Sequence, residues 1–458
     1  MPAPISTTFW RAEILMDMKI VNAFDPGAAA GMPPRERALL HRREKVLGSG
    51  YRLFYGRPVH LVRGEGVWLY DPDGNAYLDA YNNVACVGHS NEHVVSAMSE
   101  QAARLNTHTR YLTDGILDYA ERLLAYFPQP LSQVMFTCTG SEANDLAYRM
   151  AREFTQGDGF IVTENAYHGV TSAVSGMSPS LGNGVAPFVR TVPAPNSYRS
   201  PGVDVAEVFA ASVRAAVRDL RAQGIRPAAL LLDTIFSSDG ILPDPPGMLR
   251  AAVEAIHAVG GLFIADEVQA GFGRLGAGMW GFGRHDVIPD IVTLGKPMGN
   301  GFPLAGVVAR PDVAAGFGAR TRYFNTFGGN SVACAVGMAV LDVIEDLGLV
   351  DHAAAVGSHL VDGLRQLADR HEVIGDVRGS GLFIGVELVS DRATRAPAPD
   401  VTQTIVDGLR DRRVLVSSSG ASGNTLKIRP PLVFTSGHAD QLLGTLDQVL
   451  ATIGSPAG

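Results

Sequence analysis

Short apolar runs alternate with longer stretches of helical period through the middle of the chain. The runs AALLLDTIF at 228–236 and LFIAD at 262–266 are apolar at nearly every position, as strands covered on both faces are. The stretches 141–154 and 205–224 repeat their apolar residues every three or four positions, as helices do. This alternation predicts a parallel sheet with helices on both faces over about residues 85–335. Further strands are expected at 134–138, 159–164 and 290–295, and further helices at 116–127 and 248–261.

The N-terminal part of the chain has a different pattern. Residues 57–80 predict short strands joined by tight turns, and DPDG at 71–74 is a clear turn signal. Residues 1–35 are expected to be irregular, because proline and glycine interrupt them at Pro26, Gly27, Gly31, Pro33 and Pro34.

The C-terminal part predicts a smaller α+β region. It contains a helix at 331–348, a strand pair or one bent strand at 378–389, a helix at 402–413 and a proline-stopped strand at 426–435. We therefore expect a large domain over 76–335 and a small domain over 336–458, to which an N-terminal segment, 1–75, contributes.

Composition favours a compact enzyme over a solvated binding module. Of the 458 residues, 46% are hydrophobic and 18% are charged, below the usual share of about 25%. The formal net charge of −8 and the absence of a Lys/Arg cluster argue against a nucleic-acid or anionic-membrane surface. No apolar run approaches the roughly 18 residues of a membrane span.

The cysteines indicate a reducing compartment. Cys86, Cys138 and Cys334 are odd in number and have no C-x-x-C spacing, so neither a disulfide framework nor a zinc site is expected. The first 20 residues lack a basic start and a continuous apolar stretch, which argues against a signal peptide. We expect a cytoplasmic protein whose translation starts at Met1, Met16 or Met18.

The segment IADEVQAGFGRLG, residues 264–276, allows three interpretations of its acids and glycines. A nicotinamide site needs the first glycine directly after a strand and a helix at the loop, but EVQA separates the strand from the glycines and the next segment is a poor helix former. An ATPase needs a phosphate loop of the G-x-x-x-x-G-K-[ST] type, which the chain lacks. The third interpretation uses the acid itself.

Asp266 and Lys296 form the pair that pyridoxal phosphate needs. Asp266 ends one expected parallel strand and Lys296 follows the next, so both fall on the same edge of the sheet. There a lysine can form a Schiff base and a buried carboxylate can keep a pyridine nitrogen protonated. TGSEAND at 139–145 joins a strand to a helix N-terminus, whose N–H groups and Ser141 hydroxyl would bind the phosphate.

These motifs together resemble the class III aminotransferases, which are fold-type I pyridoxal-phosphate enzymes. The resemblance is carried in order by GSEAN, AYHG, IADEVQAGFGR, LGKPMGNGFPLAG and FNTFGGN, and it covers about residues 45–450. GDVRGSGLFIGVELV and LKIRPPLVFT are most similar to the group of alanine–glyoxylate aminotransferase 2 and the ethanolamine-phosphate phospholyases. The implied fold is an α/β one, with a large domain built on a mainly parallel sheet and a smaller α+β domain.

The resemblance also implies roles for individual residues. Lys296 would be the Schiff-base lysine and proton shuttle, and Asp266 would pair with the pyridine nitrogen. The ring would lie between Val268 and Tyr167, with Gln269 on its hydroxyl group. The phosphate would be held by Thr139, Gly140 and Ser141. Thr326 would reach the phosphate of a neighbouring subunit, which implies a homodimer with shared active sites, or a tetramer built from such dimers.

The chain departs from the family where many members bind glutamate. Lys427 stands three residues before the PP dipeptide where those members carry arginine, and Arg429 stands directly before it. The gating glutamate position falls near Ser238, and Asp233-Thr234 replaces the usual E-P pair. Lys427 and Arg429 are candidate anchors for a substrate carboxylate or phosphate, with solvated rim charges as the alternative.

The activity expected from this resemblance is transfer of an amino group. The substrates would be a primary amine or amino acid and a keto acid such as pyruvate or glyoxylate, with no nucleic acid, membrane or metal involved. The alternative is a phospholyase that eliminates phosphate and ammonia from phosphoethanolamine or a related phosphorylated amine.

Overall fold

The computed structural model describes residues 22–453, and the chain divides into two compact units between Pro58 and Val59. In the smaller unit a 3₁₀ helix, η1 (Pro26–Gly31), precedes α1 (Pro34–Val46). Its small core consists of Phe24, Met32 and Leu40, with Ala29 and Leu53 packed against them.

The expectation that residues 1–35 are irregular is wrong for Pro26–Gly31. Proline occupies the first helical turn, and the Asp25 side chain accepts a hydrogen bond from the Gly27 N–H at 2.9 Å. A proline in the first turn begins a helix instead of breaking it, because its fixed φ suits the helix and its missing N–H is not needed there. Residues 1–21, with the expectations about a signal peptide and about Met16 and Met18, lie outside the described residues.

The larger unit is built on a seven-stranded sheet with the order β4-β10-β9-β8-β7-β5-β6. Its strands are β4 (Gln133–Thr137), β5 (Gly159–Thr163), β6 (Val189–Val192), β7 (Pro227–Asp233), β8 (Leu262–Asp266), β9 (Ile291–Leu294) and β10 (Ala305–Ala309). All five predicted strands are present; β6 and β10 are additional. The neighbours from β9 to β6 run parallel, so the prediction of a mainly parallel sheet is confirmed.

Strand β10 is the exception, because it pairs antiparallel with both β4 and β9. Only residues 295–304 connect β9 to β10, and they hold one short 3₁₀ helix, η4 (Lys296–Gly299). A parallel crossover needs about a dozen or more residues, usually with an α-helix, so this connection returns the chain in the opposite direction.

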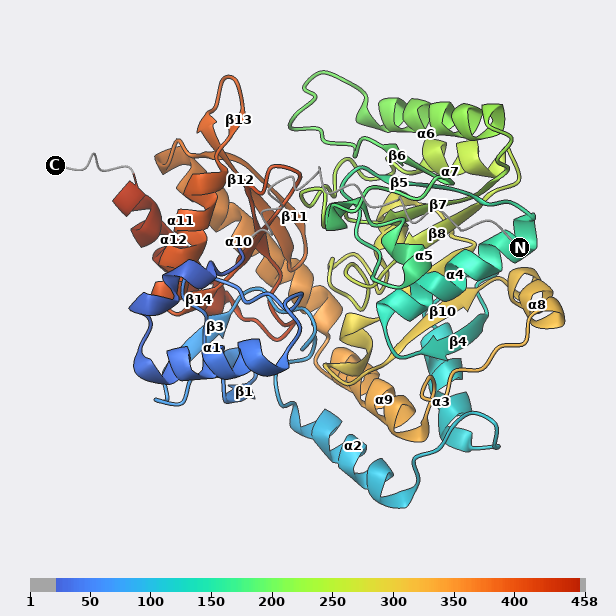
Figure 1. The fold of residues 1–458 in the computed structure, drawn as a ribbon, viewed down its shortest axis with the longest axis horizontal. Helices are drawn as coiled ribbons and strands as arrows, with labels where there is room; N and C mark the ends of the chain where they lie inside the picture. Colours follow the sequence, from blue (N-terminus) through green and yellow to red (C-terminus); the bar gives the residue numbers. More distant parts are fainter. Residues whose placement is uncertain (1–21, 454–458) are drawn as a thin grey trace, which may run out of the picture. The chain divides into compact units, whose positions relative to one another are not determined.

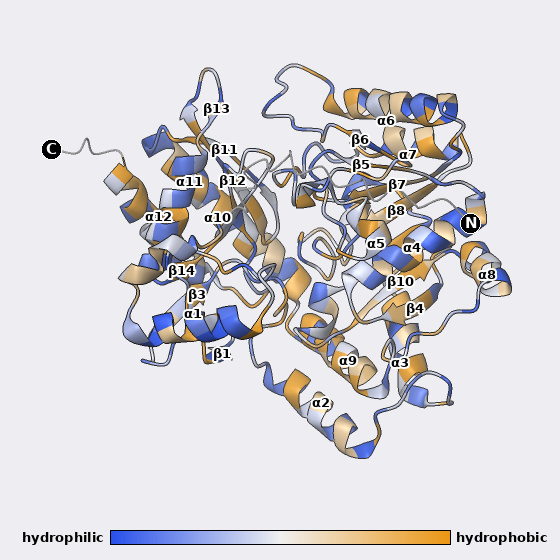
Figure 2. Ribbon diagram, viewed as in Figure 1, coloured by the Kyte–Doolittle hydropathy of each residue, from blue (hydrophilic) through white to orange (hydrophobic). Residues whose placement is uncertain are grey.

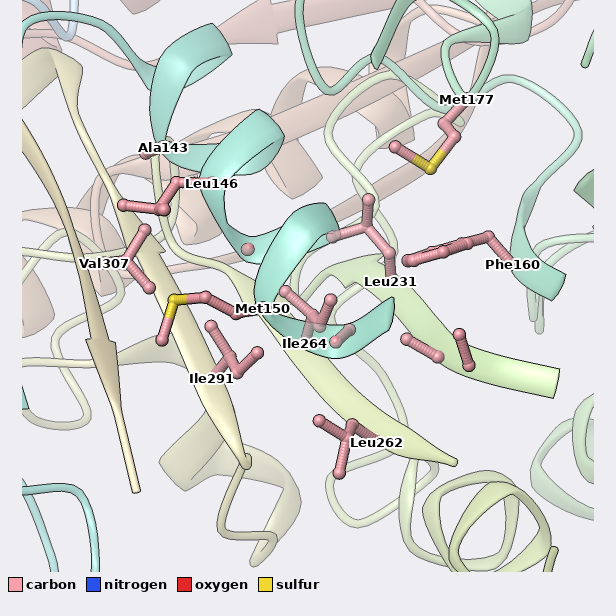
Figure 3. Packing of buried hydrophobic residues seen from close by; sticks show 14 of the residues in the cluster. Ala143, Leu146, Met150, Phe160, Met177, Leu231, Leu262, Ile264, Ile291 and Val307 are labelled. Atoms are coloured by element: carbon pink, nitrogen blue, oxygen red, sulfur yellow. The ribbon is translucent and has the colours of Figure 1, made fainter. Parts of the chain in front are cut away.

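Helices cover both faces of the sheet. On one face, Leu146 and Met150 of α4 (Gly140–Thr155) pack in one cluster with Ile264, Ile291 and Val307 of the strands (Figure 3). The other face carries α6 (Val205–Ala222) and α7 (Arg250–His257), which pack on each other and on β7 (Figure 1). Burial of each such aliphatic side chain contributes about 1.5–3 kcal/mol, and Figure 2 shows the apolar strands between the amphipathic helices.

The predicted helices at 116–127, 331–348 and 402–413 are present as α3 (Asp114–Leu124), α9 (Ser331–Asp346) and α11 (Pro399–Asp411). The pattern did not single out the others: α2 (Glu92–Arg104), α5 (Ser172–Ser175), η2 (Pro179–Leu181), η3 (Gly281–His285), α8 (Pro311–Arg320), α10 (Leu349–Arg370) and α12 (Ser436–Ile453). None of the helices between residues 22 and 453 combines the length and apolar character that a membrane span requires.

Two smaller sheets complete the larger unit. The first contains β1 (Arg63–Glu65), β2 (Trp68–Tyr70), β3 (Ala76–Asp79) and β14 (Val414–Leu415), and β14 pairs parallel with β3. The second contains β11 (Ile374–Ser380), β12 (Phe383–Asp391), β13 (Ala396–Pro397), β15 (Ser417–Ser419) and β16 (Thr425–Ile428). The stretch 378–389 therefore belongs to an antiparallel strand pair, β11–β12. The domain boundaries at 75 and 335 stay a prediction.

Candidate active site

Asp266 and Lys296 lie at the same edge of the central sheet. Asp266 ends β8 in register with Thr293 of the parallel strand β9, and Lys296 begins η4 two residues after β9 ends. Both side chains line one cavity. The other residues around it are Gly140, Ser141, Asn144, Tyr167, His168, Gly169, Asp233, Val268 and Gln269.

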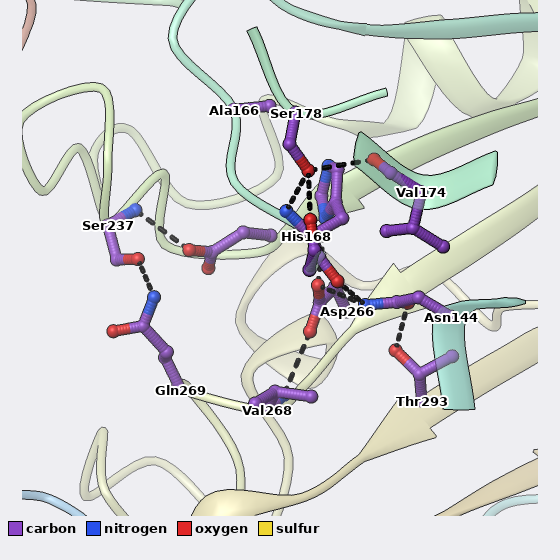
Figure 4. Close-up of polar contacts among 12 residues, drawn as sticks. Asn144, Ala166, His168, Val174, Ser178, Ser237, Asp266, Val268, Gln269 and Thr293 are labelled. Atoms are coloured by element: carbon purple, nitrogen blue, oxygen red, sulfur yellow. Dashed lines mark hydrogen bonds and ion pairs between the residues drawn. The ribbon is translucent and has the colours of Figure 1, made fainter. Parts of the chain in front are cut away.

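Every oxygen of the Asp266 carboxylate is held by a hydrogen-bond donor (Figure 4). His168 Nδ1 and Asn144 Nδ2 donate to Oδ2 at 2.8 and 2.9 Å, and the Val268 N–H donates to Oδ1 at 3.1 Å. Asn144 is held in turn by Thr293, whose hydroxyl donates to its amide oxygen at 2.8 Å. We call Asp266, His168, Asn144 and Thr293 the carboxylate cluster. These contacts fix the carboxylate in one orientation at the cavity wall.

No role for His168 or Asn144 was predicted from the sequence. Both lie within motifs that had been recognised, AYHG and GSEAN, but their side chains point away from the phosphate-binding turn and toward Asp266. Asn144 follows Ser141 by about one helical turn on α4, which brings it to the β8 side of the helix. That spacing was the available signal for Asn144.

Lys296 has an amine that is easier to deprotonate than a surface lysine. Burial, followed by the nearby charge of Arg429, lowers its pKa to about 8, against the opposing effects of Asp266 and Asp233. A substantial fraction of the side chain is therefore neutral near physiological pH, as a nucleophile or general base must be.

The start of α4 is the turn that is predicted to hold the phosphate. Gly140 and Ser141 line the cavity, whereas Thr139 is exposed and caps the helix by accepting a hydrogen bond from the Glu142 N–H at 3.1 Å. Gly169, with φ +138°, passes so close that a Cβ there would lie 2.5 Å from Ser141 Oγ. Because glycine has no side chain here, the helix N-terminus stays open toward the cavity. The N–H groups of a helix N-terminus stabilise an anion.

The other predicted cofactor contacts are placed as follows. Val268, Gln269 and Tyr167 line the cavity, and Tyr167 is 37% exposed. Gln269 Nε2 donates to Ser237 Oγ at 2.5 Å, and its amide oxygen accepts from Arg429. Thr326 is exposed and does not line this cavity, so its contact with a neighbouring subunit stays a prediction.

Lys427 and Arg429 are buried, so the alternative that they are solvated rim charges is wrong. They are only 6% and 7% exposed, because their side chains pack against Ser237, Gln269 and the rings of Tyr81 and Phe383. Lys427 Nζ donates to the Ser237 carbonyl at 3.0 Å, and Arg429 donates to the Gln269 amide oxygen. Neither has a carboxylate within ion-pair distance among residues 22–453, and burial together with Arg429 holds the pKa of Lys427 well below its usual range. We call these two residues the cation pair.

Ser237, in the loop after β7, contacts a cavity residue but does not line the cavity itself. The gating position was predicted near Ser238; the Ser237 hydroxyl accepts from Gln269, while the Ser238 carbonyl accepts from Asn165. Thr234 donates to Glu267 at 2.8 Å, and burial raises the pKa of that carboxyl to about 7. Glu267 also accepts the N–H groups of Gly281 and Phe282, so it supports the loop and does not line the cavity.

The glycines of GFGRLG do not form a dinucleotide loop. No α-helix begins there; the chain turns from residue 267 onward and only the short η3 follows. Gly276, with φ +69°, would place a Cβ 2.7 Å from the Ala354 backbone, so this glycine serves packing against α10. The nicotinamide interpretation lacks the helix N-terminus that its mechanism needs.

The cavity residues fit pyridoxal phosphate. An N-terminal helix turn with two glycines close by suits the phosphate, a fixed carboxylate suits a protonated ring nitrogen, and the Lys296 amine suits the aldehyde carbon. In addition, a Cβ on Gly140 would lie 3.0 Å from the Val268 side chain, so glycine keeps the space above Val268 free for a flat group.

Comparison with known proteins supports the same assignment. Residues 55–450 match the family Aminotransferase class-III. A Drosophila melanogaster relative named alanine–glyoxylate aminotransferase 2-like is 40% identical over 88% of this chain and 84% of the relative. An Arabidopsis thaliana relative named alanine–glyoxylate aminotransferase 2 homolog 2, mitochondrial, is 41% identical over 93% of this chain and 89% of the relative.

A solved structure is similar over nearly the whole chain. It is a phospholyase from Arthrobacter in complex with phosphoethanolamine, with a TM-score of 0.88 and 41% identity over 91% of this chain and 100% of that one. The fold is thus that of the fold-type I pyridoxal-phosphate enzymes. The chain belongs to the class III aminotransferase family, and it is an enzyme whose cofactor is pyridoxal 5′-phosphate.

Proposed function

We propose that the enzyme eliminates phosphate from a phosphorylated primary amine such as phosphoethanolamine. The observation that carries this proposal is the cation pair. Lys427 and Arg429 are two buried basic side chains directly behind the cavity lining, where Arg429 contacts the cavity residue Gln269 and Lys427 contacts Ser237, and neither has a carboxylate within ion-pair distance in residues 22–453. Buried charges are costly unless an opposite charge reaches them, so the pair favours a substrate group with two negative charges.

The chain's own residues can carry the proton and the leaving group. Bound pyridoxal phosphate draws electrons from the amine-bearing carbon of the substrate. Asp266, fixed by the carboxylate cluster, would keep the ring nitrogen protonated, and neutral Lys296 would take the proton from that carbon. The cation pair would stabilise the phosphate as its C–O bond breaks. Hydrolysis then leaves one aldehyde, one ammonia and one inorganic phosphate, with no keto-acid acceptor.

Amino transfer to a keto acid such as pyruvate or glyoxylate is the second candidate. Two relatives with aminotransferase names are 40% and 41% identical to this chain, and the first proton transfer to Lys296 is common to both routes. Under this alternative the cation pair would bind the single carboxylate of an amino acid or keto acid.

We also propose a homodimer with shared active sites, or a tetramer built from it. Large apolar side chains are exposed close to one another in sequence, with Leu112 at 99%, Tyr111 at 64% and Leu117 at 56%. Phe327, 68% exposed, follows Thr326, which would reach the phosphate of the neighbouring site. A second copy of the chain would cover this apolar surface.

A reducing, cytoplasmic location is proposed because Cys86, Cys138 and Cys334 are free thiols.

The test is incubation of the purified enzyme with phosphoethanolamine in the absence of any keto acid. Release of inorganic phosphate and ammonia in equal amounts supports elimination, whereas turnover only after addition of pyruvate or glyoxylate selects amino transfer. The Lys296→Ala variant is the control. It should lose both the activity and the visible absorbance that the bound cofactor gives the wild type.

A further inference from the structure

The side chain of Gln269 connects the cavity to Arg429. It lines the cavity, is 8% exposed, and has its amide oxygen toward the guanidinium and its nitrogen toward Ser237 Oγ. The orientation of the amide follows from chemistry, because an arginine only donates hydrogen bonds. Gln269 is therefore the one cavity-lining residue that holds Arg429 through a side-chain hydrogen bond in the described part of the chain.

All side-chain contacts of the cation pair are with neutral groups. Arg429 Cζ lies 4.6 Å from the ring centre of Tyr81 and 5.9 Å from that of Phe383, and Lys427 Nζ lies 5.5 Å from the same Phe383 ring. Arg429 Nε is buried without a hydrogen-bond partner among the described residues. Aromatic faces and amide oxygens hold a cation in place but leave its net charge intact.

A carboxylate at position 269 would have the opposite effect. Glutamate has the length of glutamine and would accept the same hydrogen bond from Arg429, but it would form an ion pair and cancel the charge. A neutral amide therefore combines two properties: it fixes the guanidinium directly behind the cavity lining and keeps it positive. Both properties are needed only if Arg429 binds an anion that comes from outside the protein.

We propose that Gln269 determines the selectivity of the site for a doubly charged anion. It holds Arg429 through a neutral amide, so that Arg429 and Lys427 together accept the phosphate group of the substrate. This inference rests on the proposed function and deepens it. It is compatible with a contact between Gln269 and the cofactor's ring hydroxyl, because the glutamine amide has a second N–H beyond the one that Ser237 accepts. Gln269 would then contact cofactor and Arg429 at the same time.

The experiment compares the Gln269→Glu variant with the wild-type holoenzyme. The affinities for inorganic phosphate and for acetate are measured by calorimetry, and visible absorbance confirms that the cofactor is bound. The variant should bind phosphate about tenfold or more weakly, with a much smaller change for acetate, because a buried carboxylate repels a dianion more strongly than a monoanion. Gln441→Glu is the matched control, since it adds the same charge at an exposed position on α12 and should change neither affinity.

A second substitution separates charge from packing. Gln269→Met has a similar volume but neither the charge nor the hydrogen bond to Arg429, so it should bind phosphate more weakly than the wild type while it keeps more of the preference for phosphate over acetate than Gln269→Glu does. A purely structural role predicts instead that both variants weaken phosphate and acetate binding equally. Equal phosphate affinity of Gln269→Glu and wild type, at full cofactor occupancy, would overturn the inference.

The failure of this inference can be distinguished from failure of the proposed function. If the wild type releases no phosphate from phosphoethanolamine but Gln269→Glu still loses its preference for phosphate, the elimination reaction is wrong and the selectivity role stands. If phosphate is released and the preference is unchanged, only the selectivity role is wrong. Should Gln269→Glu not fold, Arg429→Gln gives the same comparison, since removal of that charge must lower the preference for phosphate.

Discussion

The carboxylate cluster and the cation pair bury charge in opposite ways. The Asp266 carboxylate accepts hydrogen bonds from His168, Asn144 and the Val268 N–H, and it is 4% exposed. Lys427 and Arg429 are almost as deeply buried, yet carbonyl, amide and aromatic groups are their only partners in the described residues. Three donors therefore hold the negative charge in place, while neither basic side chain has a carboxylate within ion-pair distance in the described residues, and burial keeps the pKa of Lys427 well below its usual range.

This difference indicates which group each region receives. A carboxylate with all its positions fixed is suited to one permanent contact, the ring nitrogen of a cofactor that stays bound through the cycle. Two cations without a counter-ion are suited to an anion that enters and leaves with the substrate. The carboxylate cluster is thus suited to the cofactor, whereas the cation pair behind the cavity lining is suited to the substrate.

The largest effect is expected when the carboxylate cluster loses its charge. Asp266→Asn keeps the size of the side chain but cannot keep a ring nitrogen protonated, so kcat should fall by about 10²–10³-fold. The change is measured by steady-state kinetics with whichever substrate the enzyme turns over. Asp286→Asn is the matched control, because that carboxylate is 84% exposed and pairs only with Arg250 in the described residues. A loss of less than tenfold in Asp266→Asn would contradict the role given to this carboxylate.

A change in the cation pair should instead appear in substrate binding. Arg429→Gln and Lys427→Met each remove one buried charge that would meet the substrate anion, so KM should rise by roughly tenfold to a hundredfold while kcat changes little. Kinetics at two ionic strengths provide the measurement, since the remaining electrostatic attraction is weakened by salt. If both variants lowered kcat without raising KM, the cation pair would belong to the chemical step and the contrast between the two regions would disappear.

The sequence was sufficient to predict that Asp266 and Lys296 lie together, but it was insufficient to predict that Lys427 and Arg429 are buried. Asp266 and Lys296 follow neighbouring strands of a parallel sheet, so local pattern alone brought them to one edge. The antiparallel strand β10 was missed because AGVVA is short and made of small residues. Lys427 lies on β16 and Arg429 directly follows it, but no local pattern says whether their side chains are covered. The burial comes from long-range contacts with Ser237, Gln269 and Tyr81.

A milder loss should follow when the orientation of Asp266 is loosened. His168→Phe removes the 2.8 Å hydrogen bond to the carboxylate while it keeps a ring of similar shape, so kcat should fall by about tenfold. His168→Gln, which retains a donor, should recover part of that activity. Cofactor absorbance against pH distinguishes this positioning role from simple instability, because a carboxylate that is less well fixed changes the ring's titration. Identical pH profiles in the variant and the wild type would count against it.

The smallest expected effect is a shift in the pKa of Lys296, on which both the carboxylate cluster and the cation pair act. Its pKa is lowered to about 8, first by burial and then by the charge of Arg429. The amine reacts in its neutral form, so cofactor-free enzyme should bind pyridoxal phosphate covalently at a rate that rises with pH through about 8 and then levels off. Arg429→Gln removes one cause of the lowering, which raises the pKa of Lys296 and moves this profile to higher pH by up to about one unit. Asp266→Asn should move it in the opposite direction, because Asp266 favours the charged amine. The growth of visible absorbance after cofactor addition, followed at several pH values, measures both shifts. Shifts of the same sign in the two variants would show that Lys296 does not experience the cation pair and the carboxylate cluster as opposing charges.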